Sequence, residues 1–385
     1  MTQPDHTGDA PRQTPLLAVH RRLGATLTEF AGWLMPLRYG SETAEHLAVR
    51  TAAGLFDLSH MGEIVVTGPR AAEALDYALV GQPSALKPGR ARYTMMCAPD
   101  GGVLDDLIVY RLASEKFLVV ANAANAAVVH GELAGRAAGF GAEVADRTDD
   151  YALIALQGPN AAGILATVTG TDLTGVKYYA SHDAVVCGRP VLLARTGYTG
   201  EDGFEMFCGP QDAEPLWDGL TAAGADRGLV PAGLAARDTL RLEAGMPLYG
   251  NELGPGMTPF DAGLGRVVKF DKPGDFVGRA ALTEASRHPP RRVLAGLACR
   301  SRRVPRHGYA VLWDGEACGT VTSGAPSPTL GVPIAMAYLD PEVAARASPA
   351  GKTPGGQRES KLTIDIRGRG EPADLVTLPF YRRQS

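Results

Sequence analysis

The 385-residue sequence lacks the patterns that would place a protein in a membrane or on a nucleic acid. No apolar run reaches the roughly 18 residues that a membrane-spanning helix needs. The net charge is −4, so a basic nucleic-acid-binding protein is not indicated. The opening residues, MTQPDHTGDAPRQ, contain no apolar core like that of a secretory signal. We therefore expect a cytoplasmic protein whose partners include neither a membrane nor a nucleic acid.

Cysteine is scarce, and several common catalytic motifs are missing. The five cysteines are an odd number, and no pair has C-x-x-C spacing. No Walker loop, G-x-G-x-x-G turn or G-x-S-x-G elbow is present, so the sequence carries no nucleotide, flavin or serine-hydrolase fingerprint. Each cysteine lies in an apolar, strand-like neighbourhood, which predicts buried free thiols: Cys97, Cys187, Cys208, Cys299 and Cys318.

What the sequence contains predicts several domains. A chain of this length with 45% hydrophobic residues is too long for one simple core. Up to about residue 253, strands and helices alternate as in α+β folds whose helices cover one side of antiparallel sheets. From Val293 onwards, short strands with turn residues between them are typical of a Greek-key or jelly-roll-like β module. Residues 1–13 and 346–361 are polar, and we expect a disordered tail and a flexible loop or insertion.

Individual elements can also be predicted. Apolar periodicity favours helices over 16–23, 69–79, 126–139 and 275–285, and over 42–53 with Gly54 ending the helix. Residues 257–272 are predicted to form a loop and a strand. A hairpin is expected through the turn Gly188-Arg189-Pro190.

The most informative stretch spans residues 195–253. Its first part, RTGYTGEDGFEMF, resembles a strand-turn-strand unit whose glycines, Gly197, Gly200 and Gly203, permit positive φ angles at low steric cost. Its second part, GLAARDTLRLEAGMPLYGNEL, predicts a helix that Gly245 and Pro247 end. Carboxylates on the turn and arginines on the helix are therefore close in sequence.

Two interpretations of these charges remain open. A carboxylate can accept two parallel N–H donors from a flat, amidine-like heterocycle such as a pterin, in the fork geometry of arginine–carboxylate pairs. The alternative is a structural ion pair between the turn and the helix, because charged groups are usually exposed or paired.

A second candidate site lies in GGVLDDLIVYRL. The turn Asp100-Gly101-Gly102 predicts a hairpin, and Asp105 and Asp106 stand at the head of its second strand. Because neighbours in a strand point to opposite faces, only one of these aspartates faces a given cavity. No histidine or further acid stands at ligand spacing, so we predict no metal site. The pattern alone does not choose between the two aspartates.

Three further features have ordinary structural explanations. His60 has no cysteine, serine or second histidine at motif spacing, which favours a core histidine with satisfied hydrogen bonds. Asn122 precedes a predicted helix and is suited to cap it. Adjacent tyrosines, Tyr178 and Tyr179, are common in interfaces and cores, although their faces also suit stacking on an aromatic ligand.

These stretches resemble the aminomethyltransferase family, the T-protein of the glycine cleavage system. TGYTGEDGFE followed by GLAARDTLRLEAGMPLYG carries the resemblance most strongly. Seven further blocks agree in the same order: TPL at Thr14, FAGWLMPLRYGS at Phe30, FDLSHMG at Phe56, GGVLDDLIVY at Gly101, NAAN at Asn122, QGPNA at Gln157 and TSGAPSPTLG at Thr322. Together the blocks cover about residues 14–382, which is nearly the whole chain.

The resemblance implies an activity and a set of site residues. The implied reaction transfers the methylene carbon of an aminomethyl group from the lipoyl arm of a carrier, the H-protein, to tetrahydrofolate. Ammonia and the dihydrolipoyl carrier are released, and neither a metal nor a flavin is implied. Of the two aspartates, the resemblance assigns catalysis to Asp106. The residues that it implies around the folate are Met61, Tyr93, Asn122, Tyr178, Tyr179, Tyr198, Glu205 on the pterin edge, and Arg237 beside a folate carboxylate or the site's own acids.

The resemblance also implies a clover-leaf fold around a central folate site. Two interleaved α+β domains are expected, the first from 14–58 and 150–253 and the second from 59–149. A connecting segment, 254–292, leads to a C-terminal β-barrel at 293–385. Two other functions share parts of the pattern. One is a folate-dependent demethylase of a small methylated amine or sulfonium, and the other is a non-enzymatic folate-binding maturation factor, whose K-G-C signature is absent here.

Overall fold

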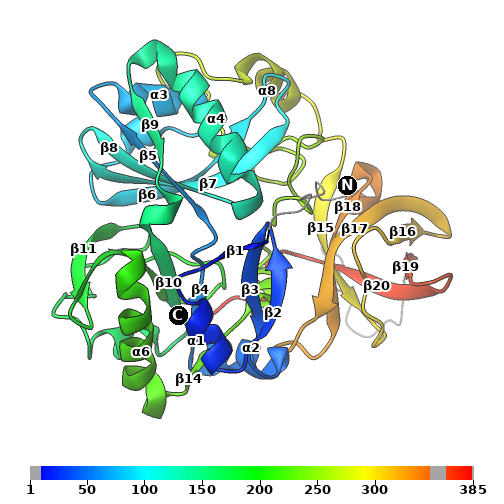
Figure 1. The fold of residues 1–385 in the computed structure, drawn as a ribbon. Helices are drawn as coiled ribbons and strands as arrows, with labels where there is room; N and C mark the ends of the chain where they lie inside the picture. Colours follow the sequence, from blue (N-terminus) through cyan, green and yellow to red (C-terminus); the bar gives the residue numbers. More distant parts are fainter. Residues whose placement is uncertain (1–9, 347–360, 384–385) are drawn as a thin grey trace.

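Three lobes surround a common centre in the computed structural model, which describes residues 10–346 and 361–383 (Figure 1). Two lobes consist of a sheet with helices on its outer face, and the third is a β-barrel. The predicted α+β clover-leaf with a C-terminal barrel is confirmed. The exact domain boundaries given above stay a prediction.

The first lobe is a sheet in the order β11-β12-β13-β10-β4-β14, antiparallel except where β14 meets β4. Its strands are β4 (Ala53–Asp57), β10 (Ala152–Gln157), β11 (Ser181–Val186), β12 (Arg189–Ala194), β13 (Gly203–Cys208) and β14 (Leu229–Pro231). The helices α1 (Leu17–Arg22), α5 (Ala161–Leu165) and α6 (Ala213–Gly224) cover one face. Phe204 and Met206 of β13 pack into that core, so the alternation of β13 directs Glu205 and Phe207 to the opposite face.

The second lobe is an antiparallel sheet in the order β6-β7-β8-β5-β9. Its strands are β5 (Gly62–Thr67), β6 (Arg90–Cys97), β7 (Val103–Ala113), β8 (Lys116–Ala121) and β9 (Glu143–Asp146). The helices α3 (Ala71–Ala78) and α4 (Ala126–Ala137) bury its outer face. Its inner face contributes Tyr110 and Val120 to a core that also contains Leu153 and Phe207 of the first lobe. The two sheets therefore pack face to face.

The first two lobes are interleaved in sequence. The chain leaves the first sheet after β4, builds the whole second sheet, and returns in β10, where Leu156 pairs with Leu55. Because β10 pairs with β4 after the chain has built the second sheet, the short segment that follows β4 lies where the two lobes meet. This segment contains His60 and Met61.

The third lobe is a closed barrel in the order β15-β18-β17-β16-β19-β20. Its strands are β15 (Val293–Cys299), β16 (Ala310–Trp313), β17 (Glu316–Pro326), β18 (Pro333–Leu339), β19 (Leu362–Asp365) and β20 (Gly370–Val376), with α9 (Pro341–Arg346) after β18. Leu297, Val321 and Ile364 are buried in its core.

Smaller elements fill the centre between the lobes. They are the sheet β1 (Arg12–Gln13), β3 (Trp33–Arg38) and β2 (Thr26–Phe30), and the helices α2 (Glu42–Thr51) and α7 (Leu234–Glu243). Gly245 follows α7 with a φ of +64°, as expected for a glycine that ends a helix. The helix α8 (Arg279–Ser286) lies on the outer side of the second lobe (Figure 1).

Two expectations about local structure need correction, and a third is not tested. Arg12 and Gln13, which we assigned to a disordered tail, pair in parallel with Trp33 and Leu34. Residues 257–272 contain a short 3-10 turn, Gly265–Val267, and no strand. The segment 346–361 lies outside the described residues except for its two ends: Arg346 completes α9, and Lys361 pairs with Asp314.

The cysteines are free thiols, as expected. Four are buried, but Cys187, in the β11–β12 turn, is partly exposed, contrary to the prediction for this residue. Within the described ranges, no helix has both the length and the apolar character needed to cross a membrane.

Candidate active site

A cavity of about 390 Å³ lies where the two sheets, α7 and the segment after α7 meet. It brings together three stretches that are far apart in the sequence: the acidic turn before β13, the arginine-bearing helix α7 and the aspartate-headed strand β7. Eight of the nine predicted site residues line it: Met61, Tyr93, Asp106, Asn122, Tyr179, Tyr198, Glu205 and Arg237.

Tyr178 is the predicted site residue that the structure does not bring to the cavity wall. Its side chain is 52% exposed, and its ring contacts that of Tyr179 edge to face, with centroids 4.8 Å apart. Tyr179 itself has a φ of +57°, an uncommon value for a bulky residue. Its main chain is held by the Ala91 N–H at 2.9 Å and by the Arg195 carbonyl at 3.0 Å. The neighbouring strands therefore fix the turn that aims Tyr179 inwards.

Asp106 is the aspartate that faces the cavity. Its Oδ2 accepts a hydrogen bond from the Tyr93 hydroxyl at 3.0 Å, and its Oδ1 accepts one from Asn122 Nδ2 at 2.9 Å. Burial raises the pKa of Asp106 to about 6, although these two donors oppose the rise. Asp106 is therefore placed to exchange a proton near neutral pH.

Asp105 points to the other face of β7, where the NAAN loop surrounds it. Its carboxylate accepts bonds from the main-chain N–H of Asn122 at 3.1 Å, from Asn122 Nδ2 at 2.9 Å and from Asn125 Nδ2 at 2.6 Å. Burial and the charge of Asp106 raise its pKa to about 7. The predicted capping role of Asn122 is wrong, because its side chain makes no cap bond and instead bridges the two aspartates.

Glu205 forms a second acidic group in the cavity. Its Oε2 accepts hydrogen bonds from the hydroxyls of Thr196 and Tyr110, the latter at 3.3 Å. Burial raises its pKa, while the Thr196 hydrogen bond and the charge of Arg237 oppose the rise. Among the described residues no donor bonds its Oε1. One oxygen of Glu205 is therefore available to a ligand with N–H donors.

Arg237 supplies positive charge on the same wall. Its guanidinium lies over the Tyr198 ring, 4.8 Å from the centroid, and forms no ion pair or hydrogen bond with the described residues. Burial lowers its pKa, while Tyr198 and Glu205 oppose that shift.

The turn–helix ion pair that we considered as an alternative is therefore not formed by Glu205 and Arg237. Other members of the stretch are paired instead: Glu201 with Arg50, Asp202 with Arg195, and Arg241 with Glu252.

Tyr110 and Thr196 are site residues that the sequence analysis missed. Tyr110 could have been found, because period-two alternation puts Asp106, Ile108 and Tyr110 on one face of β7, and all three line the cavity. Thr196 gave no comparable signal, because its position depends on the turn between β12 and β13.

The expectation that His60 has satisfied hydrogen bonds is wrong. Its ring is 3% exposed and lines the cavity, yet Nδ1 is buried with no partner among the described residues. Burial and the charge of Arg237 lower its pKa to about 4. His60 is therefore a neutral imidazole at physiological pH.

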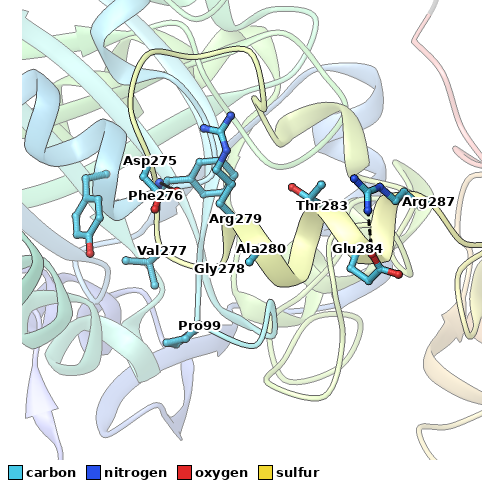
Figure 2. Close-up of a pocket in the computed structure, with 11 residues that line it drawn as sticks. Pro99, Asp275, Phe276, Val277, Gly278, Arg279, Ala280, Thr283, Glu284 and Arg287 are labelled. Carbon is cyan, nitrogen blue, oxygen red and sulfur yellow. Dashed lines mark hydrogen bonds and ion pairs between the residues drawn. The ribbon is translucent and has the colours of Figure 1, made fainter.

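A second cavity offers fewer polar groups that are free to bind a ligand. This cavity, of about 610 Å³, lies around the start of α8, and Figure 2 shows the residues that line it. Arg279 there donates to the carbonyls of Phe270 and Gly274, and Arg287 pairs with Glu284. These charged groups already have partners, so we assign the active site to the enclosed cavity. The described ranges contain no cluster of three or more metal-ligating side chains.

The fold and this cavity together define a class of protein. The two interleaved α+β lobes, α7 and the segment after α7 line a site that combines acidic acceptors, aromatic rings, apolar side chains and an arginine with no ion pair among the described residues. Such a site suits a small molecule that has a flat polar ring and an anionic group.

Comparisons with known proteins identify the family. Residues 16–272 match the model of the GCVT N-terminal domain, and residues 292–382 match that of the glycine cleavage T-protein C-terminal barrel domain. An aminomethyltransferase of Streptomyces coelicolor is 64% identical over 376 residues, covering 97% of this chain and 98% of that protein. An aminomethyltransferase of Saccharopolyspora erythraea is 63% identical and is covered completely.

A solved structure agrees with these matches. The crystal structure of the glycine cleavage system aminomethyltransferase T of Bartonella henselae superposes with a TM-score of 0.86. It is 37% identical to this chain, and the match covers 96% of this chain and 98% of that one. The chain belongs to the glycine cleavage T-protein family of aminomethyltransferases, which confirms the family that the sequence motifs indicated.

Proposed function

We propose that this chain is an aminomethyltransferase that passes the methylene carbon of an aminomethyl group from a lipoylated carrier protein to tetrahydrofolate. Ammonia and the dihydrolipoyl carrier are the other products. The observation that carries the proposal is the meeting of Asp106, Glu205 and Arg237 in one enclosed cavity of a chain that matches the family over nearly its full length. The family resemblance assigned catalysis to Asp106 and contacts with the folate to Glu205 and Arg237.

The residues of the cavity fit a reduced folate. The free oxygen of Glu205 is an acceptor for an N–H donor of a pterin edge, and hydrogen bonds to an ionised acceptor are stronger than neutral ones. Ile108, Val120 and Leu153 form apolar wall on which a flat ring can pack. The volume, about 390 Å³, lies within the range of small-molecule sites.

The chain contributes position and charge rather than a covalent intermediate. Tetrahydrofolate supplies the nitrogen that captures the methylene carbon as ammonia leaves. Asp106, oriented by Tyr93 and Asn122, is suited to hold that nitrogen in place and to stabilise positive charge that develops beside it. Its pKa of about 6 also suits it to accept a proton. Holding two reactants in line can supply roughly 7–11 kcal/mol of the barrier.

Replacing the catalytic carboxylate tests the proposal. The Asp106→Asn variant keeps the shape and the Tyr93 contact but removes the charge, so turnover should fall about 100-fold or more. Affinity for tetrahydrofolate, measured by anaerobic calorimetry, should change little, because Glu205 and Arg237 remain. Undiminished turnover would contradict the role of Asp106.

The choice of donor distinguishes this function from the two alternatives. The purified chain should release ammonia from an aminomethyl-loaded lipoyl carrier in the presence of tetrahydrofolate. Activity only with a methylated amine or sulfonium would favour a demethylase. Folate binding without turnover of any donor would favour a maturation factor.

A further inference from the structure

The rim of the active-site cavity can be located from the exposure of the residues that line it. Of the described residues in the cavity wall, Phe30 and Ala124 alone are exposed, and the others are buried or partly buried. Phe30 ends β2 and is 37% exposed. Ala124 lies in the NAAN loop, two residues after Asn122, which bonds Asp106. Solvent therefore reaches the cavity at the tip of the β2–β3 hairpin and at the NAAN loop.

A run of contacts joins these two places. The Phe30 ring meets the His60 ring edge to face, at a centroid distance of 5.6 Å. His60 lines the cavity, and Gly62 follows two residues later, at the start of β5. Gly62 pairs with Ala121, directly before the NAAN loop, and a Cβ added to it would lie 2.5 Å from Ala126 Cβ, directly after that loop. The wall from Phe30 to the NAAN loop is therefore contiguous.

The hairpin tip that carries Phe30 has an uncommon backbone conformation. Phe30 and Trp33 pair across the two-residue loop Ala31-Gly32, whose φ angles are +51° and +78°. Two positive φ angles are typical of a type I′ hairpin turn, in which the first position usually holds asparagine, aspartate or glycine. The Arg12 N–H bonds the Gly32 carbonyl at 2.8 Å, and the Arg12 guanidinium lies 4.0 Å from the Trp33 ring centroid. A strained alanine held in a cavity wall indicates a position that function requires.

The described lining residues of this wall carry no charge at neutral pH. Burial and the charge of Arg237 keep the pKa of His60 at about 4, so its imidazole is neutral. The charged lining residues, Asp106, Glu205 and Arg237, come from β7, β13 and α7 instead. An alkyl chain or a thioether suits such a wall, because it gains by leaving water and needs no hydrogen-bond partner. The apolar members of the wall include Phe30, Ala31, Met61, Ala123 and Ala124.

We propose that Phe30 is a positioning residue that binds the alkyl chain of the carrier's aminomethyl-lipoyl arm where the arm enters the cavity. This inference rests on the proposed function and deepens it. The arm must cross the rim, because it stays attached to the carrier protein while its aminomethyl carbon reaches Asp106. It is a chain of methylene groups that ends in sulfur, which matches the apolar wall. The tail of folate carries carboxylates, for which this wall offers no cation. Met61, which the resemblance assigns to the folate, then borders both reactants.

The variants Phe30→Ala and Phe30→Leu test the inference against a matched control. Phe30→Ala removes the aromatic contact surface, and Phe30→Leu keeps a large apolar side chain. Leu23→Ala is the control, because Leu23 is 40% exposed but does not line the cavity. Three quantities are measured: the KM for the aminomethyl-loaded carrier, the inhibition constant of free dihydrolipoamide against that carrier, and the affinity for tetrahydrofolate by anaerobic calorimetry.

The expected result separates contact with the arm from contact with the carrier surface. Phe30→Ala should raise the KM for the carrier and the inhibition constant of dihydrolipoamide about 10-fold each, because both depend on burying the same alkyl chain against the ring. Phe30→Leu should recover most of the loss. The affinity for tetrahydrofolate and the kcat at saturating carrier should change little, since Phe30 contacts neither the folate nor the reacting atoms. Leu23→Ala should leave all of these quantities as in the unmodified chain.

Three outcomes would overturn the inference. A higher KM with unchanged inhibition by dihydrolipoamide would assign Phe30 to the surface of the carrier protein. Weaker tetrahydrofolate binding would make this wall part of the folate site. Unchanged constants in Phe30→Ala, or no inhibition of the unmodified chain by dihydrolipoamide, would show that the arm does not bind here. If Phe30→Ala does not fold, the same two constants in Phe30→Leu decide, with a smaller rise expected.

Failure of the proposed function would look different. The unmodified chain would then release no ammonia from the loaded carrier in the presence of tetrahydrofolate, which is seen before any substitution is made.

Discussion

The side chains of Asp105 and Asp106 point to opposite faces of β7, yet both carboxylates are hydrogen-bonded to the side-chain amide of Asn122. Asn122 Nδ2 lies 2.9 Å from an oxygen of each carboxylate, so neither aspartate is independent of the other. Burial raises both pKa values, to about 7 for Asp105 and about 6 for Asp106. Two such groups titrate as a pair, with apparent pKa values that belong to both.

This coupling predicts a shift in the pH dependence of activity. Asp105→Asn removes a negative charge beside Asp106, and since a like charge raises a carboxyl pKa, the Asp106 pKa should fall. The ionised form of Asp106 then persists to lower pH. The acid limb of the kcat/KM profile, measured from about pH 5 to 8, should therefore move to lower pH.

A shift of the acid limb distinguishes electrostatic coupling of the two aspartates from a structural disturbance of the NAAN loop. A variant whose NAAN loop is merely misplaced would lose activity by a similar factor at every pH. Asn125→Ala removes one of the donors to Asp105 without changing charge, and serves as the control. An unmoved acid limb in Asp105→Asn would show that the two aspartates titrate independently.

The sequence correctly placed those site residues whose position follows from strand alternation or from a family motif. Strand alternation separated Asp105 from Asp106, and the family motifs selected the one that lines the cavity. His60 and Asn122 were misjudged because the hydrogen bonds of a polar side chain depend on neighbours that the fold brings together. Asn122 lies beside Asp106 only because β7 and β8 pair, and the wall around His60 includes Arg237, which comes from a helix much later in the chain.

At the scale of elements, helix positions were predicted well wherever apolar periodicity reflected one covered face. The expected strand in 257–272 failed for a physical reason. The apolar residues of this segment pack in a core instead of pairing in a sheet. Buried Val268 and partly buried Phe270 lie there against Val80 and Phe276. Its Lys269 N–H bonds the Val80 carbonyl, which satisfies the main chain without a strand partner.

Gly54 was also misinterpreted, and its true role gives a testable prediction. The helix α2 ends at Thr51, and Gly54 lies within β4, where an added Cβ would approach Val49 Cγ2 to 2.4 Å. Val49 is fully buried and β-branched, so it cannot rotate away cheaply. Gly54→Ala should therefore destabilise the protein by about 1–3 kcal/mol, visible as a lower Tm in calorimetry.

Gly131 provides the matched control. It lies in α4, and a Cβ added there meets nothing within 4 Å. Gly131→Ala should raise the Tm slightly, since alanine favours helix over glycine by about 0.5–1 kcal/mol. Equal responses of the two variants would mean that close packing of α2 on β4 is not what requires glycine at position 54.

At the scale of the molecule, the fold depends on contacts that no local pattern reveals. The barrel strands were predicted from their spacing, but their attachment to the other lobes was not. Glu243, at the end of α7, makes that attachment. It accepts bonds from His46 and Arg50 of α2, and from Ser327 and Thr329 in the barrel loop between β17 and β18. The main-chain N–H of Tyr381, after β20, bonds the Glu243 carbonyl at 2.8 Å.

Removing the Glu243 charge should weaken its contacts with α2 and with the barrel loop at once. Breaking one side of a buried ion pair typically costs about 3–5 kcal/mol, so Glu243→Gln should lower the Tm by several degrees. Although burial opposes it, hydrogen bonding from His46, Ser327 and Thr329 lowers the Glu243 pKa to about 2. A carboxyl group whose pKa is lowered by folding stabilises the protein at pH values above its unfolded-state pKa of about 4.3. This contribution to stability is lost as the pH falls towards 2.

The pH dependence distinguishes this role from a general packing defect. Between pH 7 and pH 5 the Tm gap between the unmodified chain and Glu243→Gln should stay constant. Below about pH 4.3 the gap should narrow, because protonation then removes from the unmodified chain the charge that the variant already lacks. Glu284→Gln is the control: Glu284 pairs with Arg287 on the surface of α8, with its side chain 62% exposed, and its Tm should not change. A gap that stays constant down to pH 3 would mean that the charge of Glu243 does not hold the barrel against α2 and α7.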